Sequence, residues 1–416
     1  MPAVKRATTN ARIRVCVCPQ RYAFSHISKS VPYLRKVSQV SWLLHMGPQH
    51  PSTHGVLHLL LQVEGEWVTH AEVEIGYMHR CFEKHAEELS FPQIIPYVDR
   101  LDYVAPLAGE HAFVLAVERA LGLTLPPRIE YLRVLAVELN RIASHLLALG
   151  TYAIDLGATT GFLWAFRDRE FILEFLEGWS GARLLYNLFW VGGIAFDLPL
   201  HFTERLREFI PYLRKNLDEL KRLLLDNRIF RDRTAGVGVI PLEVALQYGA
   251  SGPVLRGSGL AWDLRRTHPY SVYPELEFEV PVGTGAMGSL GDCWDRSWVR
   301  YREIEESLRI VEACLDRLEK RYPGGADFDP RQGEVFKKAR PRQEAALYAA
   351  VEGPRGELGF FLEVEKNKDK PRRLKVRSPS FAHLSMLPEL VQEGLWLADL
   401  VALLGSLDVV MCEVDR

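Results

Sequence analysis

Four histidines near the N-terminal end are the first side chains that could carry chemistry: His45, His50, His54 and His58. Spacing near four residues would place them on one helical face and suggest a bound metal. The glycines and prolines of the stretch Gly-Pro-Gln-His-Pro-Ser-Thr-His-Gly, residues 47–55, exclude a helix there. We predict a stiff loop that fixes a histidine at little entropic cost. The alternative for any one histidine is a structural role with a hydrogen bond to the backbone.

Two further acidic positions could act on a substrate. Asp102 and Tyr103 stand together in Arg-Leu-Asp-Tyr, and Asp155 follows a long apolar run. A carboxylate among apolar neighbours needs a cation or a hydrogen-bond donor, or it takes up a proton. The alternatives are a helix cap for Asp155 and a half-buried core position for Tyr103.

One glycine pattern resembles a dinucleotide-binding loop but does not qualify as one. Gly283, Gly285 and Gly288 match G-x-G-x-x-G, and a long helical pattern follows them. That site requires a central parallel strand before the glycines, and Pro281 lies inside the preceding run. We predict a flexible glycine-rich loop without NAD.

Composition limits the class of protein. The 416 residues include 51 basic and 53 acidic side chains, and 48% are hydrophobic, as in globular proteins. The balanced charge gives no reason to expect a nucleic-acid partner. No apolar stretch has the roughly 18 residues that a transmembrane helix needs. The six cysteines are scattered without a C-x-x-C pair, so no metal centre is expected from them.

The elements that must position these residues follow from hydrophobic periodicity. Val56 to Val63 and Trp67 to Glu74 predict a hairpin, and helical periodicity predicts a helix that ends at Gly122. Further helices are predicted over 128–149, 166–179, 203–225, 292–318 and 395–404. Strands and turns are predicted over 236–241 and 276–282, and a late hairpin over 357–365 and 373–377. This mixture indicates an α+β fold, with a central helical bundle and peripheral β-hairpins or sheets.

The N-terminal segment differs from the rest in charge. Residues 1–63 contain no acidic side chain, and residues 1–44 carry eight basic ones, which leaves 43 basic and 53 acidic residues for the body. An acid-free basic segment with Ser and Thr is typical of organelle transit peptides. The alternative is a basic arm, residues 1–44, that lies on an acidic partner.

Several of these segments together resemble a known family. They are GPQHPSTHG (47–55), IGYMHRCFEK (75–84), DRLDYV (99–104), RIASHLLALGTYAIDLGA (141–158), GSGLAWDLR (257–265) and the C-terminal EVDR (413–416). They are similar to the D subunit of respiratory complex I, the quinone-site subunit of NADH–quinone oxidoreductase, from about residue 44 to the end. The resemblance implies a fold like the large subunit of nickel–iron hydrogenases. The expected divisions of 45–416 are a β-rich quinone-loop region at 45–107, a helical bundle at 108–228 and 292–320, and β, loop and C-terminal regions at 229–291 and 343–416.

The metal of the hydrogenases is not expected in this chain. Overlaying the family patterns puts Asp102 and Ala105 at the first cysteine pair of those enzymes, and Val410 and Glu413 at the second. A nickel–iron site needs soft thiolate ligands, and none of the four positions has one. The resemblance implies a quinone pocket in place of the metal.

The resemblance also assigns roles to individual residues. It implies that His54, Tyr103 and Asp155 act at the quinone, with His50, Arg80 and Asp102 beside them. A phenol and an imidazole N–H can each polarise one quinone carbonyl, and Asp155 near His54 would favour the imidazolium. In the family an arginine that matches Arg80 is modified and precedes a glycine; here Cys81 takes that place.

The remaining expectations also come from the resemblance. Electrons would reach the quinone from a 4Fe-4S cluster in a small iron–sulfur subunit, because this chain has no electron-carrier motif. Other hydrophilic-arm subunits and the membrane arm would be further partners of this proton-pumping NADH:quinone oxidoreductase. The chain would lie peripherally on the inner face of a bacterial or mitochondrial energy-coupling membrane. The alternatives are a quinone- or ferredoxin-linked relative, a membrane-bound hydrogenase relative, and a non-catalytic scaffold subunit.

Overall fold

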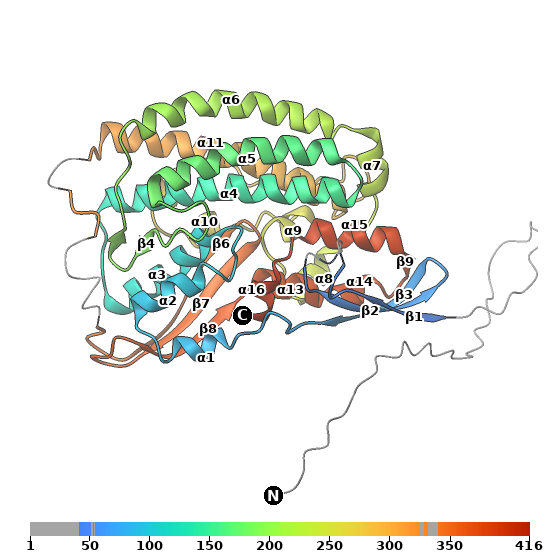
Figure 1. Cartoon of the computed structure of the whole chain (residues 1–416), viewed down its shortest axis with the longest axis horizontal. Helices are drawn as coiled ribbons and strands as arrows, with labels where there is room; N and C mark the ends of the chain where they lie inside the picture. The colour runs from blue at the N-terminus through green and yellow to red at the C-terminus, as the bar shows by residue number, and fades with distance from the viewer. Residues whose placement is uncertain (1–40, 51–52, 54, 325–327, 332–339) are drawn as a thin grey trace, which may run out of the picture.

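The computed structural model describes residues 41–50, 53, 55–324, 328–331 and 340–416. Most of the predicted basic arm 1–44, with Cys16 and Cys18, therefore lies outside the described residues. So does His54. Within the described ranges, the longest helices gather in one part of the molecule and the longer antiparallel strands in another, which confirms the α+β class (Figure 1).

The helices form a stacked bundle and a set of shorter supports. The bundle contains α4 (Pro127–Asp155), α5 (Thr159–Ser180), α6 (Phe202–Leu223) and α11 (Cys293–Lys320), which lie side by side in Figure 1. The others are α1 (Phe82–Ala86), α2 (Phe91–Val98), α3 (Pro106–Leu121), α7 (Arg228–Thr234), α8 (Leu242–Gln247), α9 (Gly252–Gly257), α10 (Leu264–Thr267), α13 (Pro379–Ser385), α14 (Leu387–Leu390), α15 (Leu397–Leu407), α16 (Met411–Asp415) and the 3-10 helix η2 (Tyr273–Glu275).

Three antiparallel sheets complete the fold. The strands are β1 (Trp42–Met46), β2 (His58–Glu64), β3 (Trp67–Glu74), β4 (Phe189–Trp190), β5 (Gly193–Ile194), β6 (Ala345–Gly353), β7 (Gly356–Val364), β8 (Pro371–Arg377) and β9 (Leu395–Trp396). The sheet orders are β1-β2-β3-β9, β4-β5 and β6-β7-β8. The first sheet encloses one core with α8, α9 and α13 to α15, and the third packs on α3 beside the main helical core.

The predicted helices and hairpins form because their patterns are local. Pro127 starts α4, which is buried nearly all round, and Gly122 ends α3 with φ 67°, a left-handed conformation that glycine adopts without strain. The amphipathic α6 buries Leu206, Leu213 and Leu220 along one face. The hairpins at β2–β3 and β7–β8 are confirmed.

Two segments predicted to contain strands and turns have no strand, so the strand part of that prediction was wrong. No strand forms over 236–241 or 276–282, because side chains and loops, not a neighbouring strand, satisfy the backbone there. The carbonyl of Phe278 accepts a hydrogen bond from Arg266, and the Glu279 N–H donates to Glu306. β6 and α16 were not predicted, and both contribute to the site described next.

Candidate functional site

Tyr103 is presented by a short turn between α2 and α3. Its side chain is 43% exposed, whereas its neighbour Asp102 is buried. The Asp102 carboxylate accepts the N–H groups of Val104 and Ala105 at 3.3 and 3.2 Å, which fixes the turn. The Asn140 side chain of α4 holds the same turn through the Val104 carbonyl. The phenol therefore projects from a rigid base.

A buried arginine connects this turn to the C-terminal region. Arg355, in the β6–β7 turn, donates to both Asp102 oxygens at 2.9 and 2.8 Å. It also donates to the Asp408 main-chain carbonyl at 2.9 Å and contacts the Asp408 carboxylate at 3.3 Å. Arg355 thereby joins the Tyr103 turn, the end of α15 and the β6–β7 hairpin.

Glu413 of α16 is the third carboxyl of this group. It is 1% exposed, and it accepts hydrogen bonds from the Ser378 hydroxyl at 2.7 Å and the Ser380 N–H at 3.1 Å. Burial, together with the charge of Asp102, raises the pKa of Glu413 to about 7. We call Tyr103, Asp102, Arg355, Asp408 and Glu413 the Tyr103 cluster.

Burial also shifts the pKa values of other members of the cluster. It raises the pKa of Asp102, although Arg355 opposes the rise. It raises the pKa of Tyr103 as well, with a smaller contribution from Cys412. The tyrosine is therefore a neutral hydroxyl, able to donate a hydrogen bond, throughout the physiological pH range.

The last residues of the chain fasten α16 to the loop after β3. The Asp415 carboxylate accepts the Gly76 N–H at 2.9 Å and the Met78 N–H at 2.7 Å. The His79 ring N–H donates to the Asp415 main-chain carbonyl at 2.7 Å. We call these contacts the C-terminal latch.

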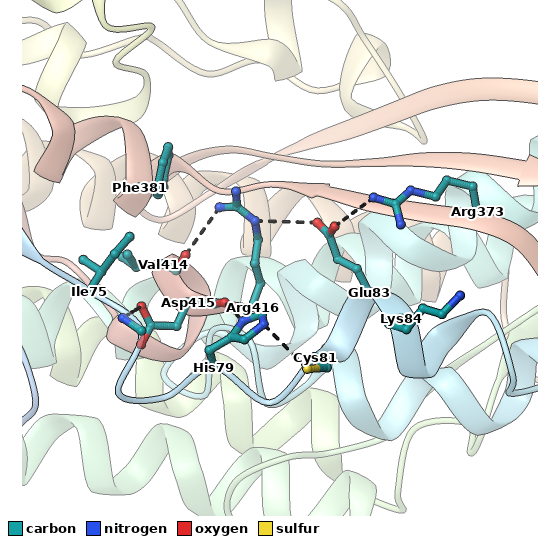
Figure 2. A pocket seen from close by; sticks show the side chains of 11 residues that line it. Ile75, His79, Cys81, Glu83, Lys84, Arg373, Phe381, Val414, Asp415 and Arg416 are labelled. Atoms are coloured by element: carbon teal, nitrogen blue, oxygen red, sulfur yellow. Dashed lines mark hydrogen bonds and ion pairs between the residues drawn. The ribbon is translucent and has the colours of Figure 1, made fainter.

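A surface pocket of about 420 Å³ lies along this latch. Figure 2 shows Arg416 at its centre, directed toward Glu83, which also contacts Arg373. Its lining residues are Ile75, Gly76, His79, Cys81, Glu83, Lys84, Arg373, Phe381, Val414, Asp415 and Arg416. Neither Tyr103 nor Asp155 lines this pocket, so the exposed phenol lies outside its walls.

Arg80 lies on the same side as the latch, close to α16. Burial raises the pKa of the Cys412 thiol, and the positive charge of Arg80 is the main opposing influence. The following Cys81 has φ 56°, a left-handed conformation that favours glycine. This backbone conformation fits the glycine that the resemblance predicts at this position, although the residue here is cysteine.

The other predicted residues occupy two different places. Asp155 ends α4, where α15 packs on it: a Cβ added to Gly405 would lie 2.9 Å from its Oδ2. His50 is exposed, and its carbonyl accepts the N–H of Thr53 at 3.1 Å. Tyr103 and Asp102 lie in the same turn before α3. Arg80 lies near α16, the helix that carries Glu413. The grouping of His54, Tyr103 and Asp155 stays a prediction.

His45 and His58, on either side of residues 47–55, lie on neighbouring strands. This agrees with the prediction that the four histidines do not share a helix. His45 of β1 and His58 of β2 lie 3.2 Å apart, between ring nitrogens, and His58 contacts Glu74 at 2.5 Å. Within the described ranges, no group of three or more His, Cys, Asp or Glu side chains could hold a metal ion.

Arg355 and Asp408 were not singled out by the sequence, and Glu413 was noted only as a position that lacks cysteine. Their partners are distant along the chain: Arg355 and Asp102 are 253 residues apart. The one local signal is the Gly-Pro-Arg-Gly sequence at 353–356, which predicts a turn between two strands and places an arginine in it. Among the helices of the described part, none is both long and apolar enough to cross a bilayer.

Comparison with known proteins gives the same family throughout. Residues 155–416 match the family model described as "Respiratory-chain NADH dehydrogenase, 49 Kd subunit". The NADH-quinone oxidoreductase D subunit of Amoebophilus asiaticus is 53% identical over 391 residues, which cover 94% of this chain and 96% of that protein. A D subunit of the same enzyme from Cytophaga hutchinsonii is 53% identical over 376 residues, which cover 90% of this chain and 95% of that protein. The D subunit of Chlorobium phaeovibrioides is 52% identical over 393 residues, which cover 94% of this chain and 96% of that protein.

Proposed function

Because this chain belongs to the 49 Kd subunit family of respiratory-chain NADH dehydrogenase, we propose that it forms the quinone site of an NADH–quinone oxidoreductase and that Tyr103 donates a proton to the quinone. The observation that carries the second part is the position of Tyr103. Its phenol is 43% exposed, on a turn that a buried arginine–carboxylate cluster holds in place. Among the alternatives, the names of the relatives favour the NADH–quinone enzyme over a hydrogenase or a scaffold.

The chemistry requires two proton donors. Reduction of a quinone to a quinol takes two electrons and two protons, one at each carbonyl oxygen. Tyr103 would give its hydroxyl proton to one oxygen, and His54 would serve the other. Asp155 would orient His54 and favour its charged form. His50, Arg80 and Asp102 would border the quinone, with Asp102 holding the Tyr103 turn from below.

The exposure of Tyr103 supports a site that a second subunit completes. A proton donor to a quinone works best where water is excluded, and this side of Tyr103 is open in the chain alone. We expect the small iron–sulfur subunit, with its 4Fe-4S cluster, to cover the tyrosine and supply electrons. Other hydrophilic-arm subunits, and the membrane arm at the quinone entry, would be neighbours of a chain that lies on the inner face of the membrane.

The proposal is tested with Tyr103→Phe in the assembled complex. Loss of the hydroxyl removes the donor but keeps the ring, so NADH:quinone turnover should fall at least about 100-fold, as for a lost general acid. NADH oxidation with an artificial acceptor that takes electrons upstream should be unchanged. The matched control is Tyr97→Phe, because Tyr97 is 45% exposed on the adjacent α2. Equal quinone turnover in Tyr103→Phe and Tyr97→Phe would contradict the role of Tyr103.

A further inference from the structure

The first sheet has one long edge along which no described strand pairs. β1 lies at the end of the order β1-β2-β3-β9, and within the described ranges it pairs with β2 alone. In an antiparallel ladder, alternate residues direct their N–H and C=O groups to the neighbouring strand, and the residues between them direct theirs outward. Figure 1 shows β1 at the outer margin of this sheet, away from the helical bundle. β1 therefore presents main-chain donors and acceptors along its outer edge.

The side chains of β1 do nothing to protect this edge. Edge strands of soluble proteins commonly carry a charged residue or a proline, which prevents pairing with another chain. β1 has the sequence Trp-Leu-Leu-His-Met, without proline, lysine, arginine or an acidic residue. Trp42, Leu43 and Leu44 are 48%, 53% and 37% exposed. An apolar edge of this kind favours the addition of a further strand.

A surface hollow of about 350 Å³ lies beside this edge. Three consecutive residues from the start of β1 line it together with side chains of β2 and β3: Ser41, Trp42, Leu43, Leu60, Gln62, His70 and Glu72. Alternate side chains of an added strand would project to each face of the sheet. On the face with the hollow, one such side chain can lie beside Leu43.

The sheet next to this edge is acidic. Residues 37–79 contain four glutamates, Glu64, Glu66, Glu72 and Glu74, and no lysine or arginine. Glu72 contacts His70 at 3.7 Å, and Glu74 contacts His58 at 2.5 Å. Among the described residues, no lysine or arginine forms an ion pair with any of the four. The negative charge therefore favours a strand that carries basic side chains.

Two occupants with the sequence of this chain fit less well. A second copy would bring the same four glutamates to the interface, and like charges oppose such pairing. The basic N-terminal segment would reach β1 most directly through a tight hairpin turn. The four residues before Ser41, Val-Ser-Gln-Val, contain none of the Gly, Asn or Asp residues on which such turns depend. A strand from another subunit meets neither obstacle.

We propose that the outer edge of β1 receives an extended strand from another subunit of the enzyme complex, and that this strand carries apolar residues and at least one lysine or arginine. Main-chain hydrogen bonds would continue the sheet past β1, and the added strand would cover Leu43. Its basic side chain would meet the negative charge that Glu72 gives to the hollow. The proposal follows from the membership of this chain in a multisubunit enzyme and does not depend on the role of Tyr103.

The first test is amide exchange in the assembled complex, resolved to single residues. We expect the amides of Leu43 to Met46 all to exchange slowly, because those bonded to β2 and those directed outward would both be protected. The amides of β2, which has a strand on each side, are the internal reference. Fast exchange at every second position of β1 would overturn the proposal.

The second test identifies the occupant. A photoreactive phenylalanine derivative is placed at position 43 of the assembled complex and activated by light. We expect a crosslink to a segment of another subunit that contains lysine or arginine. A crosslink to residues 1–40 of this chain or to a second copy, or no crosslink, would contradict the proposal. Neither test measures quinone turnover, so a normal Tyr103→Phe variant would refute the role of Tyr103 and leave the added strand in place.

The third test places a charge on the edge. Leu43→Lys imitates the lysines that protect natural edge strands, and the outward amides of β1 should then exchange fast in the purified complex. The matched control is Thr69→Lys, which adds the same charge to β3, between β2 and β9, and should keep the slow exchange. Unchanged exchange in α4 shows that both variants remain folded. Slow exchange retained in Leu43→Lys would count against an added strand.

Discussion

In the described part of the molecule, two buried sets of arginines and carboxylates differ in how completely their charges are matched. The first, which we call the interior network, lies around α4 and α11 and consists of Glu138, Arg141, His145, Arg256, Asp263, Arg265, Glu303 and Glu352. The second is the Tyr103 cluster. Both are buried and joined by short hydrogen bonds, yet only the second includes an exposed side chain able to meet a substrate.

Each carboxylate of the interior network contacts an arginine directly. Arg256 donates to Glu303 at 2.8 Å and to Glu352 at 2.7 Å, and Arg265 holds Asp263 at 2.7 Å. Burial works against the charge on Glu303, but the charge of Arg256 and the hydrogen bond from His145 outweigh it and lower the pKa of Glu303. At Glu352 burial is the larger influence and raises the pKa, although Arg256 opposes the rise. The ion pairs of this network join α4, α9, α11 and β6 and fix how they pack.

The Tyr103 cluster lacks this match at one position. Arg355 serves Asp102 and Asp408, and the hydrogen bonds to Glu413 come from neutral groups. Burial then favours a bound proton on Glu413. The comparison indicates that a fully paired network supports structure, whereas a network with one carboxyl left to neutral donors can hold and release a proton.

The largest effect is expected when the interior network loses a partner. Arg256→Met leaves Glu303 and Glu352 buried without their guanidinium, and removing one partner of a buried ion pair costs about 3–5 kcal/mol. We expect little assembled complex and a marked fall in thermal stability, measured by scanning calorimetry. Normal stability in this variant would mean that the network is not structural.

Glu413 should make the stability of the Tyr103 cluster depend on pH. The folded-state pKa of Glu413 is about 7, above its ordinary value of 4.5, so its stabilising contribution is complete below pH 4.5 and is lost as the pH rises through 7. Glu413→Gln has no such loss. The free energy of opening of residues 408–416, measured by amide exchange, should fall in the wild type by roughly 2 kcal/mol more than in Glu413→Gln between pH 5 and pH 8. The same difference between the wild type and Glu389→Gln, which removes a carboxyl charge from α14, would rule out Glu413 as its source.

The C-terminal latch is expected to have a smaller effect. Asp415→Asn keeps one acceptor oxygen and loses the charge that binds the Gly76 and Met78 N–H groups, which should weaken the latch by about 1–2 kcal/mol. Faster amide exchange over 76–83, with unchanged exchange in α4, is the predicted readout. Faster amide exchange in α4 as well would show that the latch stabilises more of the fold than the loop after β3.

The smallest effect is expected at the surface of the bundle. Arg207 of α6 contacts Asp316 and Glu319 of α11 at 2.7 and 2.8 Å, where all three side chains are more than one third exposed. Arg207→Ala should change stability by less than about 1 kcal/mol, because exposed pairs are screened by solvent. This variant is the surface control for Arg256→Met. An equal loss of stability in both variants would contradict the claim that buried ion pairs contribute more than exposed ones.

The sequence predicted what local patterns determine and missed what distant residues build. The periodicity of α4, α6 and α11 and the turn residues of the hairpins act within a few positions, and these elements were found. The strand predicted over 276–282 was wrong because its backbone bonds to the side chains of Arg266 and Glu306. Arg355 meets Asp102 only through the folding of β6 onto α3, which no local pattern indicates.

Whether quinone is reduced beside Tyr103 is tested most directly by photolabelling. A photoreactive quinone analogue is bound to the assembled complex, activated by light, and the labelled peptides are sequenced. We predict a label within the 99–104 turn of this chain, lost when excess quinone competes. A label that quinone displaces, but that never reaches this turn, would contradict reduction at Tyr103.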